Sequence, residues 1–144
     1  MSPDKGKRAK SKGRVSPEPT ATPTPEESVP PYVVRWHPDA VDERDASWPA
    51  REQVALLHAA QKLEAVGPRL GHPHSSAVRG EAGKGLRELR PRAGRSRWRA
   101  LYRQVGSSTF VILAVGPEAQ IDQRRFDDAV ARAVARFADL EVDS

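Results

Sequence analysis

The chain has 144 residues, a length typical of one domain with a tail. It contains no cysteine, which excludes a disulfide framework and a zinc site built on thiolates. No apolar run approaches the roughly 20 residues needed to cross a bilayer, and the N-terminus lacks the apolar stretch of a signal peptide. We therefore expect a cytoplasmic protein without membrane contacts.

Residues 1–30 predict a disordered tail. A basic run over residues 5–14 precedes a stretch rich in Pro, Ser, Thr and Glu. Such a segment has too little apolar surface to offset its chain entropy. The basic run favours a solubilising role over a contact with nucleic acid. We place the folded domain at residues 31–140.

The first half of this domain predicts one strand and two helices. The β-branched and aromatic stretch YVVRW (residues 32–36) is typical of a strand. Pro38 and the acidic residues that follow it are helix-start signals. A second helix is expected over residues 49–66, with Leu56, Ala59, Ala60, Leu63 and Val66 as its buried stripe, and Gly67 and Pro68 as its end.

The second half predicts three strands and a helix. After a long loop (residues 67–85) come LRELR, the turn PRAGRS and RWRALYRQV. TFVILAV, residues 109–115, is nearly all apolar, as expected of a central strand covered on both faces. A last helix should begin at Asp122 as its N-cap, with a docking face made of Phe126, Val130, Val134 and Phe137.

These elements predict an α+β fold with a small antiparallel sheet. Their order is strand, two helices, a three-strand meander and a C-terminal helix. Short links between the last three strands favour antiparallel pairing. We expect the helices to lie mostly on one face of this sheet.

The positive charge is concentrated in one segment. The formal net charge is +5, but residues 67–104 alone hold ten basic and two acidic side chains, a net of +8. Such clustering predicts a surface for a polyanion and favours RNA, with a solvated arginine-rich surface as the alternative. Guanidinium groups hold phosphate oxygens in bidentate pairs at any physiological pH. The arginines are Arg87, Arg90, Arg92, Arg95, Arg97, Arg99 and Arg103.

Two aromatic residues alternate with these arginines. Trp98, Ala100 and Tyr102 share one strand face, and Arg99, Leu101 and Arg103 share the other. The aromatic rings could stack on unpaired bases or simply belong to the core, and the sequence leaves both open.

Two further motifs give weaker evidence about function. GEAGKG (residues 80–85) has the wrong spacing for a phosphate loop and precedes a strand, so we exclude nucleotide binding on this basis. His72 and His74 lack further ligands at a suitable spacing, so neither a metal nor a cofactor is expected. Surface histidines are the favoured interpretation, with proton transfer as the minor one.

The succession of motifs resembles a known family. KLEAVGPRLGHPHSSAVRG is followed by GLRELRP, RWRALYRQV and TFVILAVG. This order and spacing resemble the RelE/HigB toxin superfamily, and most of all its phage-derived, HigB-like branch. The resemblance covers roughly residues 32–138.

The resemblance implies a type II toxin–antitoxin toxin, a ribosome-dependent endoribonuclease that cleaves mRNA by metal-free attack of the 2′-hydroxyl. It implies Arg99 as the residue that holds the scissile phosphate, and Arg90, Arg87 and Tyr102 as further catalytic residues. Arg92, Arg95, Arg97, Arg103, Arg124 and Arg125 are the expected RNA-binding residues. The expected partners are mRNA, the ribosome and an antitoxin with a helix-turn-helix.

The sequence also departs from the family pattern. Basic residues often follow the central strand in RelE-type enzymes, whereas this chain has Pro117 and Glu118. Phe126 stands where a tyrosine is often found, so Tyr102, Glu88, His72 or His74 would have to assist proton transfer, or the ribosome or water would carry it out. The alternatives are a non-catalytic nucleic-acid-binding module of the same fold and a structural partner protein.

Overall fold

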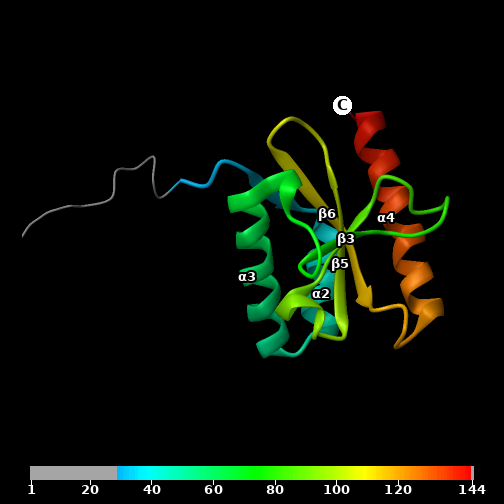
Figure 1. The fold of residues 1–144 in the computed structure, drawn as a ribbon. Helices are drawn as coiled ribbons and strands as arrows, with labels where there is room; N and C mark the ends of the chain where they lie inside the picture. The colour runs from blue at the N-terminus through cyan, green and yellow to red at the C-terminus, as the bar shows by residue number, and fades with distance from the viewer. Residues whose placement is uncertain (1–28, 144) are drawn as a thin grey trace, which may run out of the picture. The chain divides into compact units, whose positions relative to one another are not determined.

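The computed structural model describes residues 29–143, so nearly all of the expected tail (residues 1–30) lies outside the described residues. This part of the chain is an α+β domain with one five-stranded sheet, as the sequence predicted for its class (Figure 1). The strands are β2 (Val33–Trp36), β3 (Ser75–Ala77), β4 (Arg87–Leu89), β5 (Trp98–Gln104) and β6 (Thr109–Pro117). The helices are α2 (Pro38–Ser47), α3 (Ala50–Val66) and α4 (Gln123–Asp143), with short 3₁₀ turns η2 (Gly67–Arg69) and η3 (Pro91–Gly94).

The sheet is mixed, with the order β2-β6-β5-β4-β3. The predicted meander of β4, β5 and β6 is confirmed, since both pairings are antiparallel. The first strand, however, pairs parallel with β6, from Val33 opposite Thr109 to Trp36 opposite Ile112, so the sheet is not wholly antiparallel. The edge strand β3 pairs with β4 and was not predicted, because SSA is short and mostly polar.

Helices α2 and α3 cover one face of the sheet, in line with the expectation that most helices lie on one face, and α4 covers the other. Figure 1 shows α3 on one side of the sheet and α4 on the other. Leu56 and Leu63 of α3 pack with Tyr102 and Ile112 in one core, and α4 packs in a second core that contains Leu113. The reason is β6, which is apolar on both sides and needs a cover on each.

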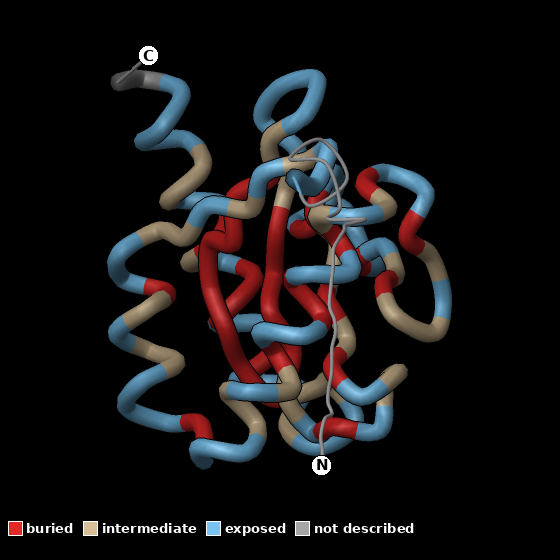
Figure 2. Tube along the Cα trace, turned by 90° about the vertical axis from the view of Figure 1, so that its left-hand side faces the viewer, coloured by how far each residue is buried: buried red, intermediate tan, exposed pale blue. Residues whose placement is uncertain are grey.

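Burial follows this layering (Figure 2). Every residue of β6 after Thr109 is buried, as expected for the strand that both layers share. β6 continues through Gly116 to Pro117, two residues beyond the expected TFVILAV strand.

The predicted ends of α3 and the start of α4 are confirmed. Gly67 adopts φ +67°, and a Cβ atom there would lie 2.3 Å from the ring of Tyr32, so only glycine fits. Asp122 caps α4, since its Oδ1 accepts from the backbone N–H of Arg125 (3.0 Å).

The predicted docking face of α4 is correct except at one position. Val134 is 43% exposed, whereas Phe126 and Val130 are buried and Phe137 is partly buried. Ala129 and Ala133 complete the buried face instead. Between residues 29 and 143, no helix combines the length and the apolar character needed to cross a bilayer.

Candidate nucleic-acid interface

A hollow of about 650 Å³ lies beside the segment that leads into β5 and collects several exposed arginines. We call it the arginine groove. Four arginines line it, Arg51 from α3 and Arg92, Arg95 and Arg97 from the segment before β5. The remaining lining residues are Pro49, Glu52, Ser96, Trp98, Glu118 and Ile121.

Most of the guanidinium groups in the arginine groove are available to a ligand. Arg92 is paired with Glu52 (Nη1 to Oε2, 3.1 Å) and is still about half exposed. The Nε of Arg95 donates to the backbone carbonyl of Arg92 (3.1 Å), which leaves its terminal nitrogens open. Within residues 29–143, the side chains of Arg51 and Arg97 make no hydrogen bond or ion pair. The groove therefore offers donors at a positive, solvent-facing surface.

The turn that presents these arginines has an unusual backbone. Arg92 and Ala93 adopt φ values of 58° and 56°, a left-handed conformation that costs side-chain-bearing residues roughly 1–2 kcal/mol each. Strain of this kind persists only where the surroundings enforce it, and it is frequent at functional sites.

Arg99 holds the backbone that follows this turn. Its Nη1 donates to the backbone carbonyls of Ser96 (2.7 Å) and Trp98 (3.0 Å), and its Nη2 approaches that of Gly94 (3.5 Å). Arg99 thus ties three carbonyls at the end of the turn to one planar group. It positions the backbone between Arg92 and Arg97.

The same guanidinium is neutralised by two carboxylates. Nε of Arg99 donates to Glu88 Oε1 (3.0 Å) and Nη2 donates to Glu118 Oε2 (2.6 Å). Arg99 is only 1% exposed. Burial, and then the nearby Arg90, lowers the pKa of Arg99, while the two carboxylates oppose this shift. Arg99 has no donor left for a phosphate, so this placement differs from the clamp that the family resemblance implies.

Arg90 joins this network, but Arg87 does not. Arg90 donates to Glu88 Oε1 (3.0 Å) and to the carbonyl of Pro73 (3.1 Å). Arg87 instead lies opposite Tyr102, on the sheet face that packs under α3, and its Nε donates to Ser75 Oγ (3.0 Å). Arg90 and Arg99 therefore meet at Glu88, whereas Arg87 does not join them, because neighbouring strand residues such as Arg87 and Glu88 point to opposite faces.

The aromatic face of β5 belongs to the core. Tyr102 is 2% exposed and its hydroxyl hydrogen-bonds with Ser75 Oγ (2.6 Å). Trp98 packs against Trp48, with ring centroids 5.3 Å apart, and is partly exposed at the arginine groove. Of the two rings, only Trp98 presents a surface on which a base could stack.

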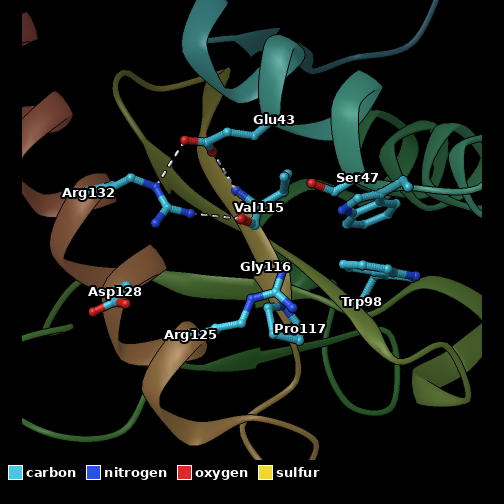
Figure 3. A pocket seen from close by; sticks show the side chains of 10 residues that line it. Glu43, Ser47, Trp98, Val115, Gly116, Pro117, Arg125, Asp128 and Arg132 are labelled. Atoms are coloured by element: carbon cyan, nitrogen blue, oxygen red, sulfur yellow. Dashed lines mark hydrogen bonds and ion pairs between the residues drawn. The ribbon is translucent and has the colours of Figure 1, made fainter.

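The other expected RNA-binding arginines lie apart from the arginine groove. Arg103 lies over the ring of Phe137 (4.2 Å to the centroid), and Arg124 is exposed in the first turn of α4. Arg125 lines a separate pocket of about 190 Å³ between α2, β6 and α4, beside Pro117 (Figure 3).

An ion-pair cluster closes the far side of this small pocket. Glu43 of α2 pairs with Arg132 (2.9 Å) and with Arg136, both from α4, and its Oε1 accepts from the backbone N–H of Val115 (3.4 Å). Burial raises the pKa of Glu43, but the hydrogen bond from Arg136 and the two positive charges outweigh it and leave the pKa below its ordinary value.

The two loop histidines have different surroundings. His72 is exposed, and His74 lines a second large hollow beside α3. Across residues 29–143, no three His, Asp or Glu side chains come together in a way that could hold a metal ion.

The sequence interpretation missed Arg51 and Glu52, which line the arginine groove from α3. For Arg51 a signal was present, since it lies on the exposed side of the helix, away from the buried stripe. It was hidden because residues 31–66 carry a net charge of −2 and were judged as one acidic segment.

Comparison with known proteins gives a consistent set of relatives. The family described as phage derived protein Gp49-like matches residues 46–136. HigB2 of Mycobacterium tuberculosis, named as a candidate toxin, is 35% identical over 111 residues, which cover 74% of this chain and 54% of HigB2. The chain thus spans about half the length of that curated relative.

Two solved structures are also similar. A chain of the toxin–antitoxin complex RelBE2 of Mycobacterium tuberculosis is 28% identical, with a TM-score of 0.48, and the match covers 61% of this chain and 99% of that one. YafQ of E. coli is 11% identical, with a TM-score of 0.42, over 63% of this chain and 98% of that one.

Proposed function

The chain belongs to the Gp49-like family of phage-derived proteins, within the RelE/HigB toxin superfamily, and from this premise we propose that it is the toxin of a toxin–antitoxin system. Its proposed activity is ribosome-dependent endonucleolytic cleavage of mRNA, which would take place in the cytoplasm. An antitoxin, expected to carry a helix-turn-helix, would hold the toxin silent.

The observation that carries the proposal is the arginine groove. Three of its four arginines, Arg51, Arg95 and Arg97, form no ion pair among residues 29–143, in a hollow of about 650 Å³. Unpaired arginines gathered in a hollow can contact a phosphodiester strand from several sides, which dispersed surface arginines cannot do. Trp98 at the same hollow adds an aromatic surface on which an unpaired base can stack, a contact worth about 1–3 kcal/mol.

The groove suits attack by the RNA's own 2′-hydroxyl. In this reaction the 2′-oxygen bonds to phosphorus, the 5′-oxygen leaves and takes up a proton, and a 2′,3′-cyclic phosphate forms. Guanidinium groups stabilise the charge that builds on the phosphoryl oxygens. Arginine is a poor proton acceptor, so among the lining residues the carboxylates of Glu52 and Glu118 are the groups able to receive the 2′-hydroxyl proton.

One observation favours a second candidate, a non-catalytic RNA-binding module. The arginine that the family resemblance implies as the clamp, Arg99, is buried and fully engaged by Glu88, Glu118 and backbone carbonyls. In this alternative the arginine groove holds RNA, and no strand is cut.

Expression of the full chain tests the proposal. Growth arrest with new mRNA 5′-hydroxyl ends on ribosomes is expected, and the double variant Arg95→Ala/Arg97→Ala should relieve both effects. Both side chains are exposed, so folding should be unchanged. The matched control is Arg35→Ala/Arg79→Ala, which removes two exposed arginines outside the groove and should remain toxic. Binding of RNA without new ends would select the non-catalytic module.

A further inference from the structure

A second hollow, of about 600 Å³, lies between α3 and the η3 turn. We call it the α3 cleft. Five basic side chains line it: His58 and Lys62 from α3, together with His74, Arg90 and Arg92. We propose that the α3 cleft is a second RNA subsite, which holds the nucleotides next to those in the arginine groove. This inference rests on the proposed binding of RNA.

The charge of the α3 cleft supports an anionic occupant. None of its lining residues is acidic, whereas the arginine groove includes Glu52 and Glu118. Among residues 29–143, the Lys62 ammonium has no ion-pair partner. Arg90 and Arg92 are paired with Glu88 and Glu52, which do not line the cleft, so Lys62 supplies the open positive charge. An open cation at a hollow favours a polyanion, and the attraction depends on salt.

The two hollows adjoin at one residue. Arg92 lines both of them. Arg51, Ala55, His58 and Lys62 follow one another at spacings of four, three and four residues, so they form one stripe on the helix surface. From Arg51 to Lys62 the stripe is roughly 16 Å long. A stacked strand rises only about 3.4 Å per nucleotide, so more than one phosphate fits along it.

The floor of the α3 cleft suits the less polar parts of a nucleotide. Ala55, Ala59 and Ala65 line it from α3, and Ala93 lines it from η3. Methyl side chains leave room above the helix and offer apolar contact to a sugar or the face of a base. Basic groups around such a floor would hold the phosphates while the bases rest between them.

An acidic peptide is the rival occupant, since carboxylates would also meet the basic rim. The position of Arg92 at both hollows favours RNA, because a single polynucleotide is long enough to contact both.

Binding of two single-stranded RNAs to the purified full chain tests the inference. Both carry 2′-O-methyl groups, so they cannot be cleaved by 2′-hydroxyl attack, and they are about 3 and about 12 nucleotides long. The variant is His58→Ala/Lys62→Ala, two exposed positions on a helix where alanine is well tolerated. Arg35→Ala/Arg79→Ala again serves as the control for the removal of positive charge.

The variant should bind the long RNA several-fold more weakly, and the slope of log affinity against log salt should fall by about 0.7 for each phosphate that the variant no longer neutralises. Binding of the short RNA should not change.

Unchanged binding of the long RNA by this variant, while Arg95→Ala/Arg97→Ala weakens the binding of both RNAs, would overturn the α3 subsite and leave the proposed function standing. Loss of binding to a glutamate-rich peptide with intact binding to the long RNA would overturn it in favour of a protein partner. If the unaltered chain binds neither RNA, the proposed function is contradicted, and the α3 subsite with it.

Discussion

Arg97 and Arg99 stand on either side of Trp98 and have opposite surroundings. Arg97 is exposed at the arginine groove and pairs with no acid among residues 29–143. Arg99 is buried, and its guanidinium meets two carboxylates and three carbonyls. The comparison teaches that a cluster of arginines along the sequence can divide into two kinds. Some hold the fold together, and others remain free for a ligand.

The largest expected effect comes from Arg99→Ala. It would leave the Glu118 carboxylate without its ion pair, leave Glu88 with Arg90 alone and release the carbonyls of the turn, which should lower the free energy of unfolding by about 3–5 kcal/mol. Urea denaturation followed by circular dichroism measures this loss. Arg97→Ala, the matched control, should stay within about 0.5 kcal/mol of the unaltered chain. Wild-type stability of Arg99→Ala with loss of RNA binding would reverse the roles assigned to the two arginines.

Tyr102→Phe should have a smaller effect. It removes one buried hydrogen bond, with Ser75, and keeps the ring, so the loss should be about 1 kcal/mol. The same denaturation experiment measures it. Because the Tyr102 hydroxyl is buried, we also expect growth arrest and mRNA ends to remain as in the unaltered chain. A stable variant without activity would show that this hydroxyl takes part in the chemistry.

The smallest effect should come from acidification, which acts on the Glu43 cluster. Glu43 is about a quarter exposed, so its surroundings are intermediate between those of the exposed Arg97 and the buried Arg99. The pKa of Glu43 is lowered in the folded chain, so its stabilising contribution is complete above the ordinary value of 4.5 and is lost as the pH falls through the lowered value. Thermal unfolding midpoints between neutral and acidic pH measure this loss. Glu43→Gln should be less stable at neutral pH and should lose less on acidification. Identical pH profiles for the two chains would rule out this contribution.

Much of the fold follows from local sequence patterns. The apolar run of β6, the stripe at Leu56 and Leu63, and the stop at Gly67 each depend on neighbouring residues, and each was predicted correctly. The parallel pairing of β2 with β6 was not, because it joins segments far apart in the chain. The short strand β3 was missed because Ser75 and Ser76 carry no strand signal.

The candidate site was less predictable than the fold. The alternation along β5 correctly separated Arg99 from Trp98, but it could not show that Glu118 reaches back from the end of β6 to neutralise Arg99. The sequence also did not predict that Arg51 of α3 lines the arginine groove, since this position depends on the packing of two segments that are distant in the chain. Which arginines are free is therefore decided by tertiary partners, and a single strand pattern does not contain them.

The parallel pairing of the first strand with the last has a consequence for biosynthesis. Val33 finds its partner only at Thr109, so the sheet stays open at one edge until almost the entire domain has left the ribosomal exit tunnel. Long-range closure of this kind is slow compared with helix formation. A nascent chain would thus complete its sheet only after β6 has been synthesised, well after α2 and α3 can form.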